Sequence, residues 1–225
     1  MSIYQEGIMR EIQKQRMMRY FIDGASQIIE EEGIGGVTVR KVADLAGYNS
    51  ATLYNYFQNL DHLVFFASMR FLKEYAQGLP NYVKGSANAL ERYYRIWEAF
   101  CFHSFNKPEI YNAIFFTKLD IPLEESIKVF YELYPQDLGE QPEELLPMLL
   151  KQNIYDRART IVEACVKEGF INEEHIAEVN EAVLLIYQGM LTRIINKQVD
   201  YSVEEAVEKT MGYIRKIIYA YQLTD

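Results

Sequence analysis

The chain has 225 residues, of which 49% are hydrophobic and 14% aromatic, so it can bury a sizeable core and is too apolar to be disordered. Its formal net charge of -9 excludes a uniformly basic surface of the kind that binds any polyanion. Cys101 and Cys165 are too few for a disulfide framework, which favours a reducing cytoplasm. No apolar run has the length of a membrane span, and the N-terminal segment lacks the pattern of a signal peptide, so no membrane association is expected.

The first predicted helix covers residues 9–32. Phe21, Ala25 and Ile28 share one face, and Gly33 is a stop signal. An acidic run at residues 30–32 is expected to face away from any bound nucleic acid. Basic residues concentrate at the start of the helix, namely Arg10, Lys14, Arg16 and Arg19.

Residues 38–46 predict a short second helix that ends in a tight turn. Thr38 stands at the N-cap position, and Gly47 can adopt the left-handed conformation that ends a helix. The apolar residues between them recur at i, i+3, i+4 and i+7, namely Val39, Val42, Ala43 and Ala46.

A third helix is predicted over residues 50–56, with a fourth following directly. Asn49 can cap the third helix, in which Leu53 and Phe57 share a face, and Asn59 can cap the fourth. A helix, a glycine turn and a short second helix form the helix-turn-helix layout, whose second helix enters the DNA major groove.

This segment resembles the DNA-binding domain of the TetR family of bacterial transcription regulators. The resemblance rests on Thr52-Leu53-Tyr54 with Tyr56-Phe57 at a fixed distance after Ala46-Gly47, together with Thr38, Val42, Ala43 and Leu63. It implies an all-α protein with an N-terminal three-helix helix-turn-helix domain at residues 1–66. Residues 67–225 would form a larger C-terminal helical domain for ligand binding and dimerisation. That part agrees with the family in length and helical pattern only.

Residue types predict how the N-terminal domain contacts DNA. Asn side chains hydrogen-bond base edges, and an Ala or Thr methyl can meet a thymine methyl. The resemblance implies that Tyr54 contacts the phosphate backbone, whereas Tyr56 suits either the backbone or the core. Backbone amides after Asn59 can add a phosphate site. The predicted DNA-binding residues are Thr38, Arg40, Lys41, Ser50, Ala51, Thr52, Tyr54, Asn55, Tyr56 and Asn59.

One position departs from the family pattern. The residue after Asn59 is Leu60, where the family usually has Lys, and the acidic Asp61 follows it. The resemblance therefore implies that one phosphate contact is missing and that binding depends more on the basic N-terminal arm.

Beyond residue 65 the chain is predicted to be all helix. Residues 65–77 continue the fourth helix until Gly78, Pro80 and Gly85 interrupt it. Helices at 87–106 and 110–118 carry an aromatic stripe that is either ordinary core or, as the resemblance implies, the wall of a ligand pocket. The predicted ligand is apolar or aromatic. An organic cation would also suit the faces of the rings, and Arg92, Arg157 or Arg159 could serve an anion. The predicted ligand-binding residues are Tyr93, Trp97, Phe100, His103 and Phe116.

The C-terminal third predicts a loop followed by three helices. Residues 133–147 are rich in proline and acidic residues and suggest a loop or lid, and a helix at 149–167 follows. Two further helices, at about 173–196 and 203–222, are apolar over more than one stripe, and Ser202 with Glu205 forms a capping box. They suit a four-helix homodimer interface, the alternative being packing within one subunit.

No residue pattern indicates catalysis. His62, His103 and His175 lie far apart, Cys101 and His103 do not have a metal-binding spacing, and phosphate loops and nucleophile elbows are absent. We therefore predict no enzyme activity, no cofactor and no metal. The predicted function is a cytoplasmic, homodimeric regulator that binds a double-stranded DNA operator, a repressor released by a small-molecule inducer. The alternatives are a helical ligand- or protein-binding module with a vestigial helix-turn-helix, and an all-helical enzyme.

Overall fold

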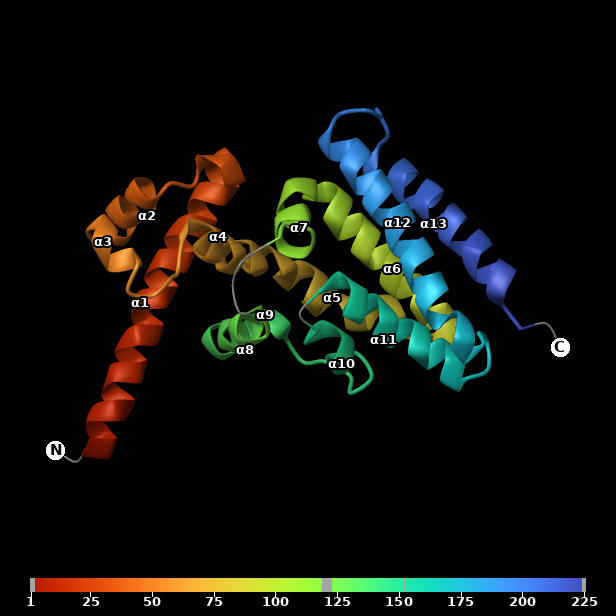
Figure 1. Ribbon diagram of the computed structural model, residues 1–225, viewed down its shortest axis with the longest axis horizontal. Coiled ribbons are helices and arrows are strands. Elements are labelled where there is room, and N and C mark those ends of the chain that lie inside the picture. The colour runs from red at the N-terminus through yellow and green to blue at the C-terminus, as the bar shows by residue number, and fades with distance from the viewer. Residues whose placement is uncertain (1–2, 119–122, 152, 224–225) are drawn as a thin grey trace. The chain divides into compact units, whose positions relative to one another are not determined.

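The computed structural model describes residues 3–118, 123–151 and 153–223, which form helices joined by short connections (Figure 1). In this part of the chain β pairing is limited to one isolated bridge, between Ile171 and Gln222. The all-α class predicted from the sequence is confirmed. The functional domain boundary after residue 66 stays a prediction. By its contacts the chain forms two units, Met1–Leu72 with Phe116–Gln136 and Lys73–Phe115 with Asp137–Asp225.

The first unit contains the predicted helix-turn-helix and one later helix. A 3-10 turn at Arg70–Leu72 ends α4, where the sequence predicts an unbroken helix over 65–77. The elements are α1 (Ile3–Glu32), a 3-10 turn (Ile34–Gly36), α2 (Val39–Ala46), α3 (Ser50–Leu53), α4 (Leu60–Met69) and α8 (Leu123–Leu133), followed by α9 (Pro135–Leu138).

The third helix is shorter than the sequence predicts. α3 ends at Leu53, and residues 54–56 form a turn instead of continuing the helix. The Asn55 N–H donates to the Thr52 carbonyl (3.2 Å) and the Tyr56 N–H to the Leu53 carbonyl (3.0 Å), a three-residue spacing that tightens the backbone. The Phe57 N–H still reaches the Leu53 carbonyl (3.1 Å), and both side chains are buried, as predicted.

An aromatic cluster forms the core of the first unit. Phe21 of α1 is fully buried, with ring centroids of Tyr48 at 5.8 Å and Tyr56 at 6.0 Å. Its ring meets Phe57 edge-on at 6.4 Å, and Phe57 meets Phe66 of α4 edge-on at 5.8 Å. Such ring pairs stabilise beyond the area that they bury. The cluster therefore fixes α3 and its following turn against α1 and α4.

A buried histidine links α4 to α8 within the first unit. The Gln58 backbone N–H donates to His62 Nδ1 (3.3 Å), and His62 Nε2 lies 3.2 Å from the Ser126 hydroxyl. Burial lowers the pKa of His62 below its ordinary value of 6.5, because the charged imidazolium loses its hydration. The folded unit thus favours the neutral ring.

Acidification should destabilise the first unit through His62. The folded-state pKa is lowered from 6.5, so the unfolded chain takes up the proton more readily. The stability that depends on neutral His62 is complete above pH 6.5 and is lost as the pH falls below it. We expect His62→Asn, which keeps an acceptor for Gln58, to flatten the fall in Tm between about pH 7.5 and 5.5. His175→Asn should keep the full slope, and an unchanged slope in His62→Asn would contradict this role.

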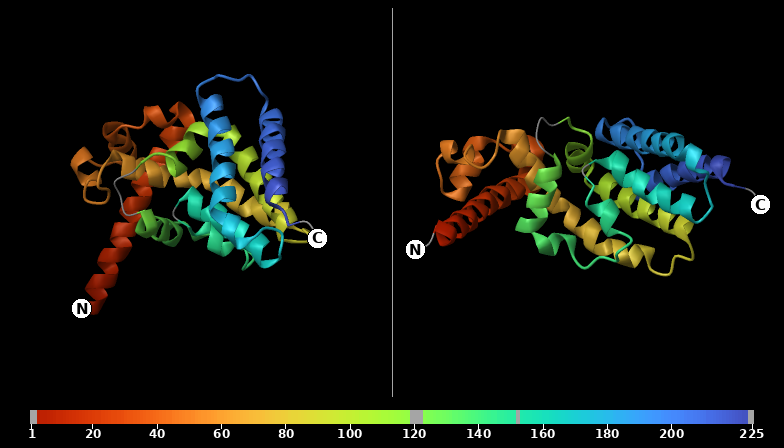
Figure 2. Two further views of the ribbon diagram at one scale, coloured as in Figure 1. Left: turned by 45° about the vertical axis from the view of Figure 1, so that its right-hand side comes forward. Right: turned by 60° about the horizontal axis from the view of Figure 1, so that its bottom comes forward.

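The second unit is built around α6. This helix packs against α5, α11 and α13, and α12 lies beside α13 in all views (Figures 1 and 2). Within the described residues, none of the helices is sufficiently long and apolar to cross a membrane. The elements are α5 (Lys73–Val83), α6 (Ala89–Asn106), α7 (Pro108–Phe115), α10 (Leu146–Leu149), α11 (Ile154–Lys167), a 3-10 turn (Glu173–His175), α12 (Ile176–Ile195) and α13 (Val203–Tyr221).

Helix α5 continues through two of the three predicted interruptions and ends at Val83, before the third, Gly85. Gly78 and Pro80 lie inside it, so the predicted end at residue 77 is wrong. Proline has no N–H, which leaves the carbonyl of Ala76, four residues earlier, without its helical donor. The Gln141 side-chain amide donates to this carbonyl at 2.7 Å. A residue distant in the sequence thus supplies the hydrogen bond that the proline removes.

The proline-rich segment 133–147 is not one loop. It contains α9, which starts at Pro135, and the first residues of α10, where Pro147 stands near the helix start. Proline suits the first turn of a helix, where its missing N–H has no helical acceptor in any case. The helix predicted at 149–167 begins only at Ile154, capped by Asn153, whose Oδ1 accepts from the Asp156 N–H (2.8 Å). Residue 152 lies outside the described residues.

The two C-terminal helices pack mainly within the second unit, and α13 starts at a capping box. The predicted capping box is confirmed, since Ser202 Oγ accepts from the Glu205 N–H (3.2 Å) and Glu205 Oε2 from the Ser202 N–H (2.9 Å). The Asn172 cap predicted for α12 instead opens the 3-10 turn that precedes it. Much of their apolar face is buried, including Val179, Val183, Tyr187, Ile214 and Ile218.

Candidate DNA-binding surface and ligand cavity

The turn between α2 and α3 has the geometry that a helix-turn-helix requires. Thr38 caps α2, since its hydroxyl oxygen accepts from the Lys41 N–H (3.2 Å). Gly47 ends α2 in the left-handed region, with φ 76° and ψ 28°. The Tyr48 N–H reaches the Ala43 carbonyl at 2.9 Å, the closing bond of a Schellman motif. The caps and the left-handed glycine predicted from the sequence are confirmed.

Gly47→Ala should destabilise the protein through its backbone alone. A Cβ at this position would meet nothing within 4 Å, but φ is positive. The left-handed conformation costs an L-residue about 1–2 kcal/mol, and Asn tolerates it better. We therefore expect Tm to fall in the order Gly, Asn, Ala. Gly189→Ala, also in open space but inside a helix, should instead raise Tm. Equal Tm values for the Asn and Ala variants would contradict a backbone cause.

Helix α3 and its following turn expose polar side chains. Ser50, Ala51 and Asn55 are exposed, and Tyr54 has 55% of its surface accessible. Thr52 is only half-buried, and its hydroxyl lies 3.0 Å from Asn49 Oδ1, which leaves the methyl group as its outward feature. Four of the predicted DNA-contacting residues are therefore accessible to solvent.

The other two predicted positions near α3 have structural contacts. Tyr56 is half-buried against Phe21, which gives its ring a packing role. Asn59 caps α4, since its Oδ1 accepts from the His62 N–H (2.8 Å). The first N–H groups of α4 have no helical acceptor and can meet a phosphate. Asp61 is exposed beside them and would oppose such a phosphate.

The two cations at the start of α2 lie beside carboxylates. Lys41 Nζ pairs with Glu32 Oε2, and Arg40 Nε lies 3.9 Å from Asp44 Oδ2. The expectation that the acidic run 30–32 faces away from the DNA-binding residues is therefore wrong for Glu32. The reason is the 3-10 turn, which brings the start of α2 back beside the end of α1. Both pairs are exposed and hence weak, so each cation can exchange its carboxylate for a phosphate.

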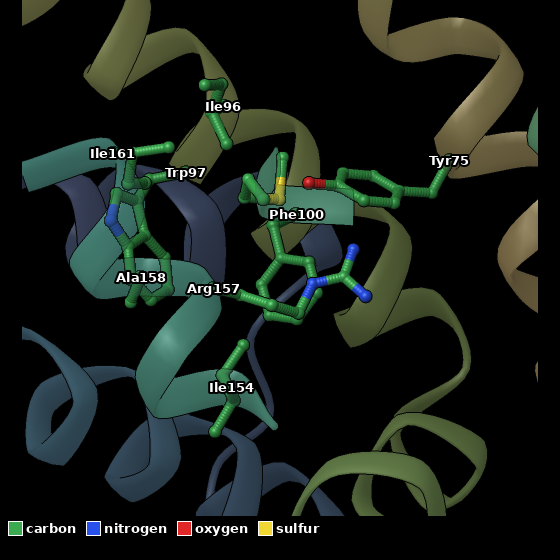
Figure 3. A pocket seen from close by; sticks show the side chains of 9 residues that line it. Tyr75, Ile96, Trp97, Phe100, Ile154, Arg157, Ala158 and Ile161 are labelled. Atoms are coloured by element: carbon green, nitrogen blue, oxygen red, sulfur yellow. The ribbon is translucent and has the colours of Figure 1, made fainter. Parts of the chain in front are cut away.

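The second unit contains a mostly apolar cavity (Figure 3). Its volume is about 20 Å³, which is room for about one water molecule and far below the range of about 300–1,000 Å³ that is common for small-molecule sites. The polar groups in its wall are the Tyr75 hydroxyl, the Trp97 indole N–H and the Arg157 guanidinium. The lining residues are Tyr75, Ile96, Trp97, Phe100, Met148, Ile154, Arg157, Ala158 and Ile161.

The structure places two of the five predicted ligand-binding residues in this wall. Trp97 and Phe100 line the cavity, with ring centroids 5.9 Å apart. Tyr93 is buried one turn earlier on α6, with its ring 6.5 Å from Trp97, and is not a lining residue. His103 is half-buried near tyrosine rings of α5 and likewise lies outside the lining. Phe116 belongs to the first unit.

Sequence reasoning missed the part of the wall that α11 supplies. Ile154, Ala158 and Ile161 recur at i, i+4 and i+7, which is a signal for a shared helical face. Arg157 was one of three arginines considered for an anion, but its burial could not be inferred from the sequence. Only 3% of its surface is exposed, and its guanidinium carbon lies 5.2 Å from the Phe115 ring centroid.

Neither cysteine has the environment of a reactive thiol. Cys101 and Cys165 are free and buried, and burial raises the pKa of Cys165 to about 12 and that of Cys101 further. Thiols of this kind stay protonated and are poor nucleophiles. Among the described residues no group of three or more His, Cys, Asp or Glu side chains could hold a metal ion.

Comparison with known proteins points to one family. Residues 21–65, from the second half of α1 into α4, match the model of the bacterial regulatory proteins of the tetR family. No curated protein sequence matches the chain. The match covers the aromatic cluster except Phe66, both caps of the helix-turn-helix and α3.

Solved structures with similar folds extend over nearly the whole chain. A candidate TetR-family regulator from Mesorhizobium loti MAFF303099 is 9% identical, with a TM-score of 0.57 over 93% of this chain and 98% of that one. A candidate TetR-family regulator from a Rhodococcus species is 18% identical, with a TM-score of 0.52 over 92% and 99%. The fatty acid degradation regulator FadR from Bacillus halodurans is 15% identical, with a TM-score of 0.50 over 88% and 93%. At these identities the likeness concerns the fold alone. The helix-turn-helix geometry and the match of residues 21–65 together show that this segment belongs with the bacterial regulatory proteins of the tetR family, a family of DNA-binding regulators of transcription.

Proposed function

We propose that the protein is a cytoplasmic, homodimeric repressor that leaves its operator when a small molecule occupies the cavity of the second unit. The observation that carries the proposal is the surface of Ser50, Tyr54 and Asn55. These side chains are exposed, have no structural task in the unit, and extend from a backbone fixed by caps and an aromatic core. The proposal includes no catalytic step, cofactor or metal.

Exposed apolar side chains on α12 and α13 support the homodimer. Leu185 is 62% exposed, Tyr213 53% and Tyr219 78%, although the rest of these helices buries its apolar face within the unit. A two-fold pair of subunits would present two α3 helices about 34 Å apart, one turn of DNA. Each subunit would then contact one half of a near-palindromic operator.

Ligand control requires that the ligand favour one state of the protein. A molecule that binds the DNA-bound and released forms equally well shifts nothing. The cavity, at about 20 Å³, is far smaller than such a site, so a ligand would have to widen it. Displacement of α6 or α11 by that widening would supply the difference between the two forms.

Enrichment of genomic DNA fragments by the purified protein tests this function. At near-physiological salt we expect recovery of a near-palindromic site, with the Tyr54→Ala, Asn55→Ala double variant as the background. Deletion of the gene should raise expression of the genes next to that site. Lower expression on deletion would refute repression, and recovery no better than the double variant would refute sequence-specific binding by the protein alone.

A second candidate is a helical ligand- or protein-binding module whose helix-turn-helix is vestigial. The ion pairs of Arg40 and Lys41 with carboxylates favour it, as do Leu60 and the net charge of -9. Under this alternative the double variant at Tyr54 and Asn55 would retain the protein's cellular function.

A further inference from the structure

Arg157 is a buried cation that has no carboxylate partner among the described residues. It lines the cavity with 3% of its surface exposed, and the ion pairs of the described residues do not include it. Arg159, two residues later on the same helix, shows the contrast: it is exposed and pairs with Glu163 at 2.8 Å. Helix α11 thus provides a carboxylate for its surface arginine, while the arginine in the cavity wall lacks one.

The local environment does not compensate the charge of Arg157. A guanidinium stays protonated in proteins, so burial cannot neutralise it by loss of a proton. A buried charge is strongly unfavourable unless it is paired. The Phe115 ring, 5.2 Å from the guanidinium carbon, offers only a weak cation–π contact. The remaining wall is apolar side chains, apart from Tyr75 and Trp97.

We propose that the cavity binds an amphipathic organic anion whose carboxylate pairs with Arg157 while its apolar body contacts Trp97 and Phe100. Arginine presents a planar fork of donors that matches a carboxylate in two parallel hydrogen bonds. Figure 3 shows Arg157 and Phe100 among the side chains that line the cavity, with Ile154 and Ala158 on the same helix as the arginine. This deepens the proposed function by naming the ligand class of the same site, and it replaces the neutral ligand that the sequence favoured. Because the cavity volume is only about 20 Å³, the apolar body of the anion enters only if the helices that wall the cavity move apart.

The protein contains its own probe for this site. Trp97 is the only tryptophan in the sequence and lines the cavity, so its fluorescence reports occupancy without DNA. We would titrate the full-length protein with octanoate, octan-1-ol and octylamine, which share a chain and differ in the charge of the head group. Octanoate should bind at least about 30-fold more tightly than octan-1-ol, the effect expected for one buried charge pair.

Substitutions at two arginines of α11 distinguish binding at Arg157 from a general effect of the protein's charge on its affinity for octanoate. Arg157→Met keeps the length of the side chain and should reduce the preference for octanoate to about onefold, whereas Arg157→Lys should retain part of it. Arg159→Met removes the same charge outside the cavity and should keep the full preference. In the ligand-free protein, Arg157→Met should melt at the same or a higher temperature, because an uncompensated buried charge has been removed.

The titrations and Tm measurements can each overturn the proposed anion site. Equal binding of octanoate and octan-1-ol by the wild type, or an unchanged preference in Arg157→Met, overturns the proposal, as does a preference for octylamine. A marked fall in the Tm of ligand-free Arg157→Met would show a paired arginine and would also count against it. If octanoate binds through Arg157 but leaves DNA bound, the anion site stands and ligand-induced release fails. If only octan-1-ol or octylamine releases DNA, release stands and the anion site fails.

Discussion

Asn55→Ala should remove most of the protein's preference for its operator over random DNA. Asn55 is exposed in the turn after α3, and an amide side chain can form two hydrogen bonds with an adenine edge. One such contact contributes about 1–3 kcal/mol of discrimination. In a homodimer both half-sites lose it, so we expect specificity to fall by at least about 30-fold. Fluorescence anisotropy with operator and scrambled duplexes, at one fixed salt concentration, measures the ratio directly.

Two control variants separate base contacts from other effects. Asn81→Ala changes an exposed amide on α5 in the second unit and should leave both affinities unchanged. Arg40→Gln should weaken binding to operator and scrambled DNA alike and reduce the salt slope by about one per subunit, since it removes a phosphate contact. If Asn55→Ala retained full specificity at an unchanged Tm, this side chain would not contact a base.

Phe21→Ala should destabilise the first unit by about 3–5 kcal/mol, the cost of removing a buried aromatic ring. Phe21 is fully buried and lies against the rings of Tyr48, Tyr56 and Phe57. Small domains have a free energy of unfolding of about 5–15 kcal/mol, so this substitution would remove a large part of that stability. We expect DNA binding to fail as well, since the same cluster holds α3 in place. Urea denaturation followed by circular dichroism gives the change in the free energy of unfolding.

The neighbouring residue on α1 provides a matched control. Tyr20 is 55% exposed, and Tyr20→Ala should cost about 0.5 kcal/mol or less. Phe21→Leu, which retains most of the volume, should cost less than Phe21→Ala. Similar losses for Tyr20→Ala and Phe21→Ala would show that the aromatic cluster does not hold α1 to the helix-turn-helix.

The helix-turn-helix could be predicted because its signals act over a few residues. Thr38, Asn49 and Asn59 each accept a hydrogen bond from a backbone N–H three positions later, and Gly47 meets a conformational need of its own backbone. Helical periodicity also identified Leu53 and Phe57 as core. Local chemistry of this kind is independent of the rest of the chain, which is why the sequence alone predicted the caps, the glycine turn and the core positions of this segment.

Contacts between residues that are distant in the sequence decided the features that the sequence did not predict, namely the cavity wall and the course of α5. The sequence placed Tyr93, Trp97 and Phe100 on one helix face, but only packing by α11 put the last two in a cavity wall. From the sequence alone, Pro80 predicts the end of a helix. In the structure the helix continues, and the Gln141 side chain donates to the Ala76 carbonyl, which the proline leaves without its helical donor.

The sequence by itself thus determined the all-α class, the caps and the exposed residues of α3. Only the tertiary structure decided which cations have a carboxylate partner. Lys41 pairs with Glu32, whereas Arg157 pairs with no carboxylate of the described residues. Periodicity tells which residues share a helix face, whereas the neighbours of that face depend on how the whole chain packs.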